Sequence, residues 1–125
     1  MTTTFFERFF GALDGPDPVS SLDFVAEDMR FAIFWTAGAG RESEQHLGGK
    51  EDLRRFVEEG GVRTWTHHLT RTTLADGIEM ALGETRYNDT GERAATFVAT
   101  AQLDDEGRMS RYMVARTPAI GFGEA

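Results

Sequence analysis

The hydrophobic positions in the first half of the chain predict mostly helices. From about Thr4 to Leu13 the apolar residues recur at intervals of three and four, which predicts a helix with one broad aromatic face. After "DGPDP" a new segment begins, where Pro18 suits the first turn of a helix and the Asp17 carboxylate suits its cap. This second helix is predicted to end near Ala26. "KEDLRRFVEEGG" predicts a third helix that ends at its paired glycines.

The second half alternates apolar and polar residues with a period of two, which is typical of strands. Four long strands are predicted at 62–74, 78–88, 92–104 and 108–117, separated by the turn sequences "ADG", "DTG" and "DEG". "MRFAIFW" predicts a shorter strand, and "TAGAGRESEQHLGG" after it predicts an exposed loop or ragged hairpin. Such strands need one covered face, and only the helices can cover it. We predict one α+β domain over residues 1–125, with three N-terminal helices on the concave face of a curved, mostly antiparallel sheet and a tail at 117–125.

Composition narrows the classes of function. The chain of 125 residues has a net charge of −8 and no basic block, which argues against binding to nucleic acid. It has no cysteine, so a disulfide, a thiolate metal site and a cysteine nucleophile are excluded. "MTTTFFERFF" does not look like a signal peptide, and no later segment approaches the roughly 20 apolar residues of a membrane span. We expect a cytoplasmic protein that binds neither nucleic acid nor membrane.

Two adjacent histidines lie in the predicted strand 62–74. Strand parity groups Trp65, His67 and Leu69 on one face, and it places His68 among threonines on the other. Adjacent strand residues point to opposite faces, so the two histidines are not expected to bind one metal ion. His67 is either a core histidine satisfied by one hydrogen bond or a general base that faces a pocket.

The same parity argument puts two charged residues on apolar strand faces. Glu84 shares a face with Met80 and Leu82, and Arg111 shares a face with Met113. Such charges either mark the point where a strand emerges into solvent or supply polar groups to a pocket.

Four segments carry a resemblance to a known superfamily: "ALDGPDPVSSLDFVAEDMRF", "HLGGKEDLRRFVEEG", "THHLTRTTLADG" and "LDDEGRMSRY". In this order and spacing they resemble nuclear transport factor 2-like domains, and among these the SnoaL-like and scytalone dehydratase-like branch. The resemblance implies a conical α+β fold in which an aspartate that ends the first helix faces a histidine of the first long strand across a pocket. These two residues match Asp14 in "ALDGPD" and His67 in "THHL".

The sequence also departs from the enzymes of that superfamily. Leu13 stands where scytalone dehydratase has a tyrosine, and no second histidine lies near Gly83 and Glu84. "FVATAQL" lacks the expected asparagine. The tyrosine and paired carboxylates of ketosteroid isomerase have no counterparts, since Tyr87 and Tyr112 both lie late in the chain. Scytalone dehydration itself is therefore not expected.

Two kinds of function remain open. The first is a cofactor-independent isomerase, dehydratase or cyclase in which His67, held by Asp14, acts as general base on a small apolar, polyketide-like or steroid-like molecule. The second is a non-catalytic module for ligand binding or dimerisation. Neither needs a metal or another cofactor. The pocket is expected to be lined by Phe9, Phe10, Leu13, Trp35, Leu69, Met80, Leu82, Glu84, Arg111 and Met113.

The outer face of the sheet is predicted to form a homodimer. Hydroxyl groups and modest apolar area on this face suit a subunit contact better than a surface dense in Lys and Glu would. The residues expected there are Thr66, His68, Thr96, Val98, Thr100 and Tyr112.

Overall fold

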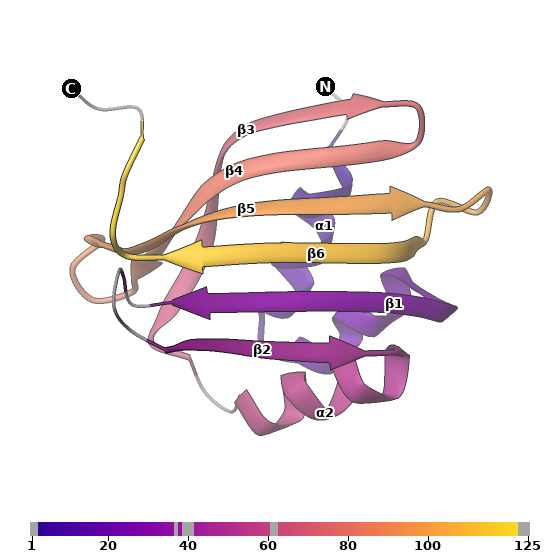
Figure 1. Ribbon diagram of the computed structural model, residues 1–125, viewed down its shortest axis with the longest axis horizontal. Helices are drawn as coiled ribbons and strands as arrows, with labels where there is room; N and C mark the ends of the chain where they lie inside the picture. Colours follow the sequence, from indigo (N-terminus) through magenta and orange to yellow (C-terminus); the bar gives the residue numbers. More distant parts are fainter. Residues whose placement is uncertain (1–2, 37, 39–41, 61–62, 123–125) are drawn as a thin grey trace.

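One sheet with helices against its inner face forms the fold (Figure 1). The computed structural model describes residues 3–36, 38, 42–60 and 63–122. Along the chain the elements are α1 (Phe5–Leu13), the 3-10 helix η1 (Pro18–Phe24), β1 (Val25–Thr36), β2 (Ser43–Gly48), α2 (Lys50–Gly60), β3 (Trp65–Ala75), β4 (Ile78–Tyr87), β5 (Arg93–Leu103) and β6 (Met109–Thr117). This is an α+β fold, as predicted.

The described strands form one open, mostly antiparallel sheet in the order β2-β1-β6-β5-β4-β3. The predicted meander is present, because β3, β4, β5 and β6 pair antiparallel with their chain neighbours. The first predicted residue of β3, Val62, lies outside the described residues. β1 joins the other side of β6 as the parallel pair of the sheet. The segment expected to be an exposed loop or ragged hairpin contributes β2, which pairs with β1 at the edge.

The helical layer is less regular than predicted. The second predicted helix is the 3-10 helix η1, and it ends at Phe24. Val25 and Ala26, which were expected to be helical, belong to β1. Their place in the sheet has a physical reason, since Val25 pairs with Met109 of β6 and both are buried in the core. The third predicted helix is α2, which packs against β1 and η1.

Helix α1 buries its aromatic face and is held at its N-terminus by the sheet. Thr4 caps the helix by accepting a hydrogen bond from the Glu7 amide. The carboxylate of Glu79, buried on β4, accepts hydrogen bonds from the amides of Phe5 (3.1 Å) and Phe6 (2.8 Å). These amides have no partner within the helix, and the negative charge lies at the positive end of the helix dipole. Glu79 therefore fixes α1 on the sheet.

The inner face of β4 carries the small and polar residues of the strand, contrary to the parity prediction. Ala81 and Thr85 are buried there, whereas Met80 and Leu82 point to the opposite face. Gly83 explains the choice of face. A Cβ atom at this position would lie 2.5 Å from the His68 carbonyl oxygen and 2.6 Å from the ring of Phe97. Small inner residues thus leave room for aromatic rings above the sheet.

A β-bulge reverses the predicted parity of β6. Gln102 pairs with Arg111, but the next residue, Leu103, pairs with Met109, so Ser110 is the extra residue. Met109, before the bulge, points inward and is buried. Beyond the bulge the faces are exchanged, and Tyr112 is buried while Arg111 and Met113 are exposed.

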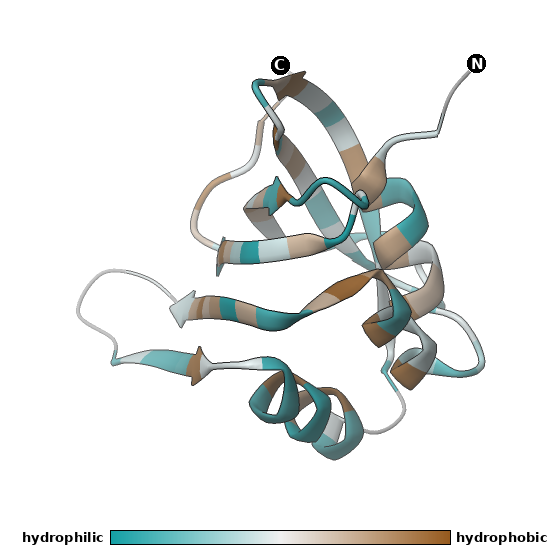
Figure 2. Ribbon diagram, turned by 90° about the vertical axis from the view of Figure 1, so that its right-hand side faces the viewer, coloured by the Kyte–Doolittle hydropathy of each residue, from teal (hydrophilic) through white to brown (hydrophobic). Residues whose placement is uncertain are grey.

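Exposed apolar side chains gather on the outer face of the sheet. Met80, Val98 and Met113 are 49%, 52% and 54% exposed. Met80 and Met113 both pair with Thr100, so the group is contiguous across β4, β5 and β6. Figure 2, coloured by hydropathy, shows brown segments along the strands as well as on the helices.

Two residues expected on this outer face do not form part of its exposed surface. Tyr112 lies on the inner face, for the reason given above. Thr96 is buried beneath the C-terminal segment, where its hydroxyl donates a hydrogen bond to the Ile120 carbonyl.

The anchoring role of Glu79 predicts a loss of stability on substitution. Glu79→Ala leaves two buried amides without an acceptor, and it is expected to lower the free energy of unfolding by about 3 kcal/mol in urea denaturation. Glu84→Ala on the outer face of the same strand is the control, with an expected loss within about 1 kcal/mol. Equal losses in the two variants would contradict the anchoring role.

Candidate functional site

A cavity of about 530 Å³ lies between α1, α2 and the inner face of the sheet. One wall is apolar and includes Phe9, Leu53 and Val57 from the two helices. The opposite wall holds aromatic and charged side chains from β1, β3, β6 and the segment before β3. These are Trp35, Arg63, Trp65, His67, Tyr112 and Arg116. The volume is in the range of sites for small organic ligands.

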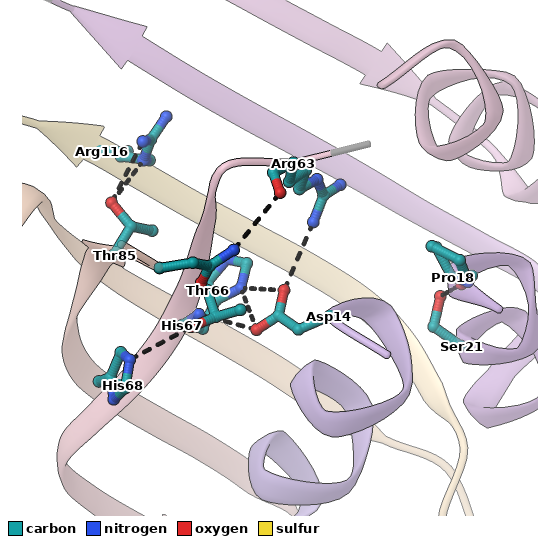
Figure 3. A network of polar contacts seen from close by, with 10 residues as sticks. Asp14, Pro18, Ser21, Arg63, Thr66, His67, His68, Thr85 and Arg116 are labelled. Atoms are coloured by element: carbon teal, nitrogen blue, oxygen red, sulfur yellow. Dashed lines mark hydrogen bonds and ion pairs between the residues drawn. The ribbon is translucent and has the colours of Figure 1, made fainter. Parts of the chain in front are cut away.

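Asp14 and His67 are in direct contact (Figure 3). Asp14 is the C-terminal cap of α1, and its carboxylate points toward β3. Its Oδ2 accepts a hydrogen bond from the His67 backbone amide at 2.7 Å, and its two oxygens lie 3.0 and 3.1 Å from His67 Nδ1. The carboxylate therefore favours the tautomer with a proton on Nδ1. In the described part of the chain, no protein group hydrogen-bonds to Nε2.

Aromatic rings surround the imidazole of His67. It stacks on Phe10 with a centroid distance of 4.1 Å, and it meets the edges or faces of Trp65 (5.3 Å) and Phe97 (5.2 Å) in T-shaped contacts. The side chain of His67 is 9% exposed and that of Asp14 is 11% exposed. Burial lowers the pKa of His67, and the hydrogen bond to Asp14 opposes this effect. The ring is consequently neutral at neutral pH, with a lone pair on Nε2.

Arg63 extends the polar network beyond Asp14. Its Nη1 lies 3.6 Å from Asp14 Oδ1, too far for a hydrogen bond, and its guanidinium lies 5.2 Å from the ring centre of Trp65. This Nη1 is buried and has no hydrogen-bond partner among the described residues. Burial also lowers the pKa of Arg63.

Arg116 is the second cation of the cavity. Its guanidinium lies 4.2 Å from the ring centre of Trp65 and 4.6 Å from that of Trp35, both within cation–π range. Its Nε and Nη2 donate hydrogen bonds to the buried hydroxyl of Thr85, at 3.3 and 3.1 Å. Burial lowers the pKa of Arg116, and the nearby charge of Arg63 lowers it further.

Tyr112 completes the polar wall from β6. It lines the cavity, and its ring contacts Phe6 and Phe9 of α1. Burial raises the pKa of its hydroxyl, so Tyr112 is a neutral hydrogen-bonding group throughout the physiological range.

Only some of the predicted site residues meet at this cavity. Phe9, Leu13, Trp35 and His67 line it. Asp14 and Phe10 lie behind His67, one hydrogen-bonded to the ring and the other stacked on it. Leu69 packs against the core beside Phe10 on the other side of His67.

The remaining predicted residues are on the outer face and do not line the cavity. The inner face of β4 is the face of small side chains, and the bulge at Ser110 turns the later residues of β6 outward. Glu84 pairs with Arg86 there, at 3.0 Å. The corrected residues are Met80, Leu82, Glu84, Arg111 and Met113.

Four residues of the polar wall were absent from the sequence prediction of the pocket. Trp65 could have been predicted from the sequence, because it lies on the same strand face as His67. Tyr112 and Arg116 lie four residues apart on the face of β6 that the bulge turns toward the cavity. No sequence pattern marks a bulge at Ser110. Arg63 lies in the irregular segment before β3, where parity gives no direction.

Over the residues that the structure describes, no three His, Cys, Asp or Glu side chains gather closely enough to hold a metal ion. None of the helices described is long and apolar enough to cross a membrane.

Comparisons with solved structures identify the fold. A provisionally assigned isomerase of the SnoaL-like family from Agrobacterium tumefaciens str. C58 superposes with a TM-score of 0.70 at 13% identity, over 90% of this chain and 93% of that one. A provisionally assigned polyketide cyclase from Sinorhizobium meliloti gives 0.63 at 14% identity, over 90% and 94%. The yeast UBP3-associated protein BRE5 gives 0.62 at 16% identity, over 90% of each chain.

The likeness to these proteins is one of fold. The chain has the nuclear transport factor 2-like fold of SnoaL-like proteins, as its sequence resemblance implied. Compared with protein-family models and with curated proteins, the sequence finds no match.

The contact between Asp14 and His67 predicts the direction of a pKa change. The carboxylate stabilises the imidazolium, so Asp14→Asn is expected to lower the pKa of His67 further below its usual value of about 6.5. Two-dimensional NMR of the imidazole resonances against pH measures this shift. Asp105→Asn, in the exposed β5–β6 turn, is the control and should leave the titration unchanged. A pKa of His67 that rises in Asp14→Asn would refute the assigned contact.

Proposed function

We propose that this protein binds a small, mostly apolar molecule in the cavity and that His67 acts on it as a general base. The observation that carries the proposal is that the two ring nitrogens of His67 have different surroundings. His67 lines the cavity, and its Nδ1 is hydrogen-bonded to Asp14. Its Nε2 has no hydrogen-bond partner among the described residues. A base needs this combination of a fixed tautomer and an unoccupied lone pair.

The electrostatics of the pair suit proton abstraction at neutral pH. Because burial lowers the pKa of His67, the ring is already in its basic form when a ligand arrives. When Nε2 takes a proton, the positive charge appears beside the Asp14 carboxylate, 3.0 Å from Nδ1. Asp14 is thus a positioning residue that also stabilises the protonated state.

The surroundings of the ring favour chemistry at a weakly acidic carbon. Phe10, Trp65 and Phe97 pack around the imidazole, and such rings exclude water that would compete for the base. Removing a proton next to a carbonyl is the common first step of isomerisation, dehydration by elimination and intramolecular condensation. Tyr112 and the cavity arginines are candidates for stabilising the resulting enolate oxygen. This reaction class needs no cofactor.

The fold neighbours are consistent with this reaction class. Two of them are provisionally assigned as an isomerase and a polyketide cyclase. The proposal rests on the site and not on the fold, because one fold can carry many different activities.

The second candidate is a non-catalytic binding or dimerisation module, and the outer face of the sheet favours it. Met80, Val98 and Met113 form a contiguous apolar group that is about half exposed. Exposed apolar groups of this kind are typical of subunit contacts. We propose that two copies pair through this face, an arrangement that is compatible with catalysis as well as with simple binding.

A proton-exchange assay against a panel of carbonyl compounds tests the general base. The protein is incubated in D₂O with a set of cyclic ketones, conjugated enones and β-hydroxy ketones, and ¹H NMR follows the loss of protons next to the carbonyl. We expect exchange with at least one compound, reduced about 10²- to 10⁴-fold by His67→Gln. Asp14→Asn should reduce it less, because the base itself remains.

The adjacent histidine supplies the control for this assay. His68 is exposed on the other face of β3 and contacts Thr66, so His68→Gln should leave the exchange rate unchanged. Absence of exchange for every compound, or equal rates in wild type and His67→Gln, would leave the non-catalytic module as the function.

The proposed homodimer predicts sensitivity to charge on the outer face. Val98→Glu combined with Met113→Glu places like charges in the contact, and light scattering should show a change from dimer to monomer. Leu74→Glu is the matched control, since Leu74 is an exposed apolar residue at the end of β3, outside the group. A monomer mass for the wild type at micromolar concentration would overturn the dimer.

A further inference from the structure

Arg116 is a charged group of the cavity. Among the described residues, no carboxylate lies within ion-pair distance of its guanidinium. The hydrogen bonds that it makes go to one neutral acceptor, the Thr85 hydroxyl. A partly buried charge left without an opposite charge is costly. An anionic ligand would supply the missing charge.

The geometry of the Thr85 contact leaves one edge of the guanidinium available. Thr85 accepts from Nε and Nη2, which share one edge of the planar group. The end of the group, formed by Nη1 and the second hydrogen of Nη2, makes no hydrogen bond within the described chain. Two parallel N–H groups in this arrangement match the two oxygens of a carboxylate.

Two tryptophans and Thr85 together restrain the position of Arg116. The guanidinium carbon lies 4.6 Å from the ring centre of Trp35 and 4.2 Å from that of Trp65, both within cation–π range. Its Nε and Nη2 are tied to the Thr85 hydroxyl. Preorganisation of this kind reduces the entropy lost on binding.

A second cation faces the same cavity with an unsatisfied donor. Arg63 Nη1 is buried and has no hydrogen-bond partner in the described chain, although Asp14 lies 3.6 Å away. Asp14 is already engaged by His67. The exposed Glu44 and Glu59 lie at the rim and form no ion pair with either arginine. The inner cavity thus holds two guanidinium groups and one shared carboxylate.

From this placement we infer that the ligand of the cavity is a small aromatic or alicyclic carboxylate. Its carboxylate binds the free edge of Arg116, with Arg63 as a second positive group, and its ring lies against the apolar wall of Phe9, Leu53 and Val57. The inference names the substrate class of the proposed site and so rests on the proposed function for any reaction. The binding itself does not depend on His67.

Binding of matched acid and amide pairs tests the inference. Isothermal titration calorimetry compares 2-naphthoate with 2-naphthamide, and further acid and amide pairs built on phenyl and cyclohexyl rings. In the wild type at least one acid is expected to bind roughly tenfold or more tightly than its amide, as two charge-assisted hydrogen bonds imply. Arg116→Met should abolish this preference. The control Arg8→Met, on the exposed side of α1, should keep it.

A conservative variant guards against loss of the fold in Arg116→Met. Arg116→Lys keeps the charge but cannot present two parallel N–H groups, so the preference for the acid should fall to about threefold or less. The inference is overturned if no acid binds more tightly than its amide in the wild type. It is also overturned if a folded Arg116 variant keeps the full preference.

The two proposals fail in different ways. His67→Gln should retain the preference for the acid, because His67 is not part of the anion site. Arg116-dependent binding of acids without His67-dependent proton exchange would remove the general base and leave the anion site. His67-dependent exchange on neutral ketones, without any preference for acids, would remove the anion site and leave the general base.

Discussion

Two carboxylates, that of the buried Glu79 and that of the partly buried Asp14, hold α1 on the sheet, and the site depends on where they place it. Glu79 of β4 accepts the first free amides of the helix, and Asp14 at the other end accepts the backbone amide of His67. One carboxylate belongs to the sheet and the other to the helix, so the helix cannot slide or rotate without breaking a charge-assisted hydrogen bond at one end. The second anchor is also the polar partner of the catalytic candidate. The same contact therefore holds the helix and, in the proposed function, positions the base.

Side-chain size on the inner face decides where the cavity can form. Ala81, Gly83 and Thr85 of β4 leave space beside Phe97 for the rings of α1, and Phe10 fills that space by stacking on His67. The core is closed beneath this cluster. The cavity lies toward α2 and β1, where Trp35, Arg63 and Arg116 line it in place of packed aliphatic side chains.

The charges of the cavity explain why the same site suits both proposals. Burial lowers the pKa values of His67, Arg63 and Arg116, because it disfavours the charged form of each group, and the charges of the two arginines lower the pKa of His67 further. Of the three groups, His67 is the one that loses its charge at neutral pH, because its usual pKa lies nearest to neutrality. An anionic ligand beside the arginines would weaken the effect of their charges on His67. In the proposed function, binding of a carboxylate would raise the pKa of His67 and so make it a stronger base.

The sequence alone determined the elements whose signals are local. The aromatic face of α1, the four-strand meander and the inward direction of His67 follow from side-chain periodicity, and the pairing of Asp14 with His67 came from the family resemblance. Tertiary structure decided the rest. The apolar residues of β4 face outward because α1 needs small neighbours, and the bulge at Ser110 brings Arg116 inward while it turns Arg111 out. Periodicity reports that a strand has two faces, but which face is covered depends on the volume of what packs against it, and that is a property of residues distant in the chain.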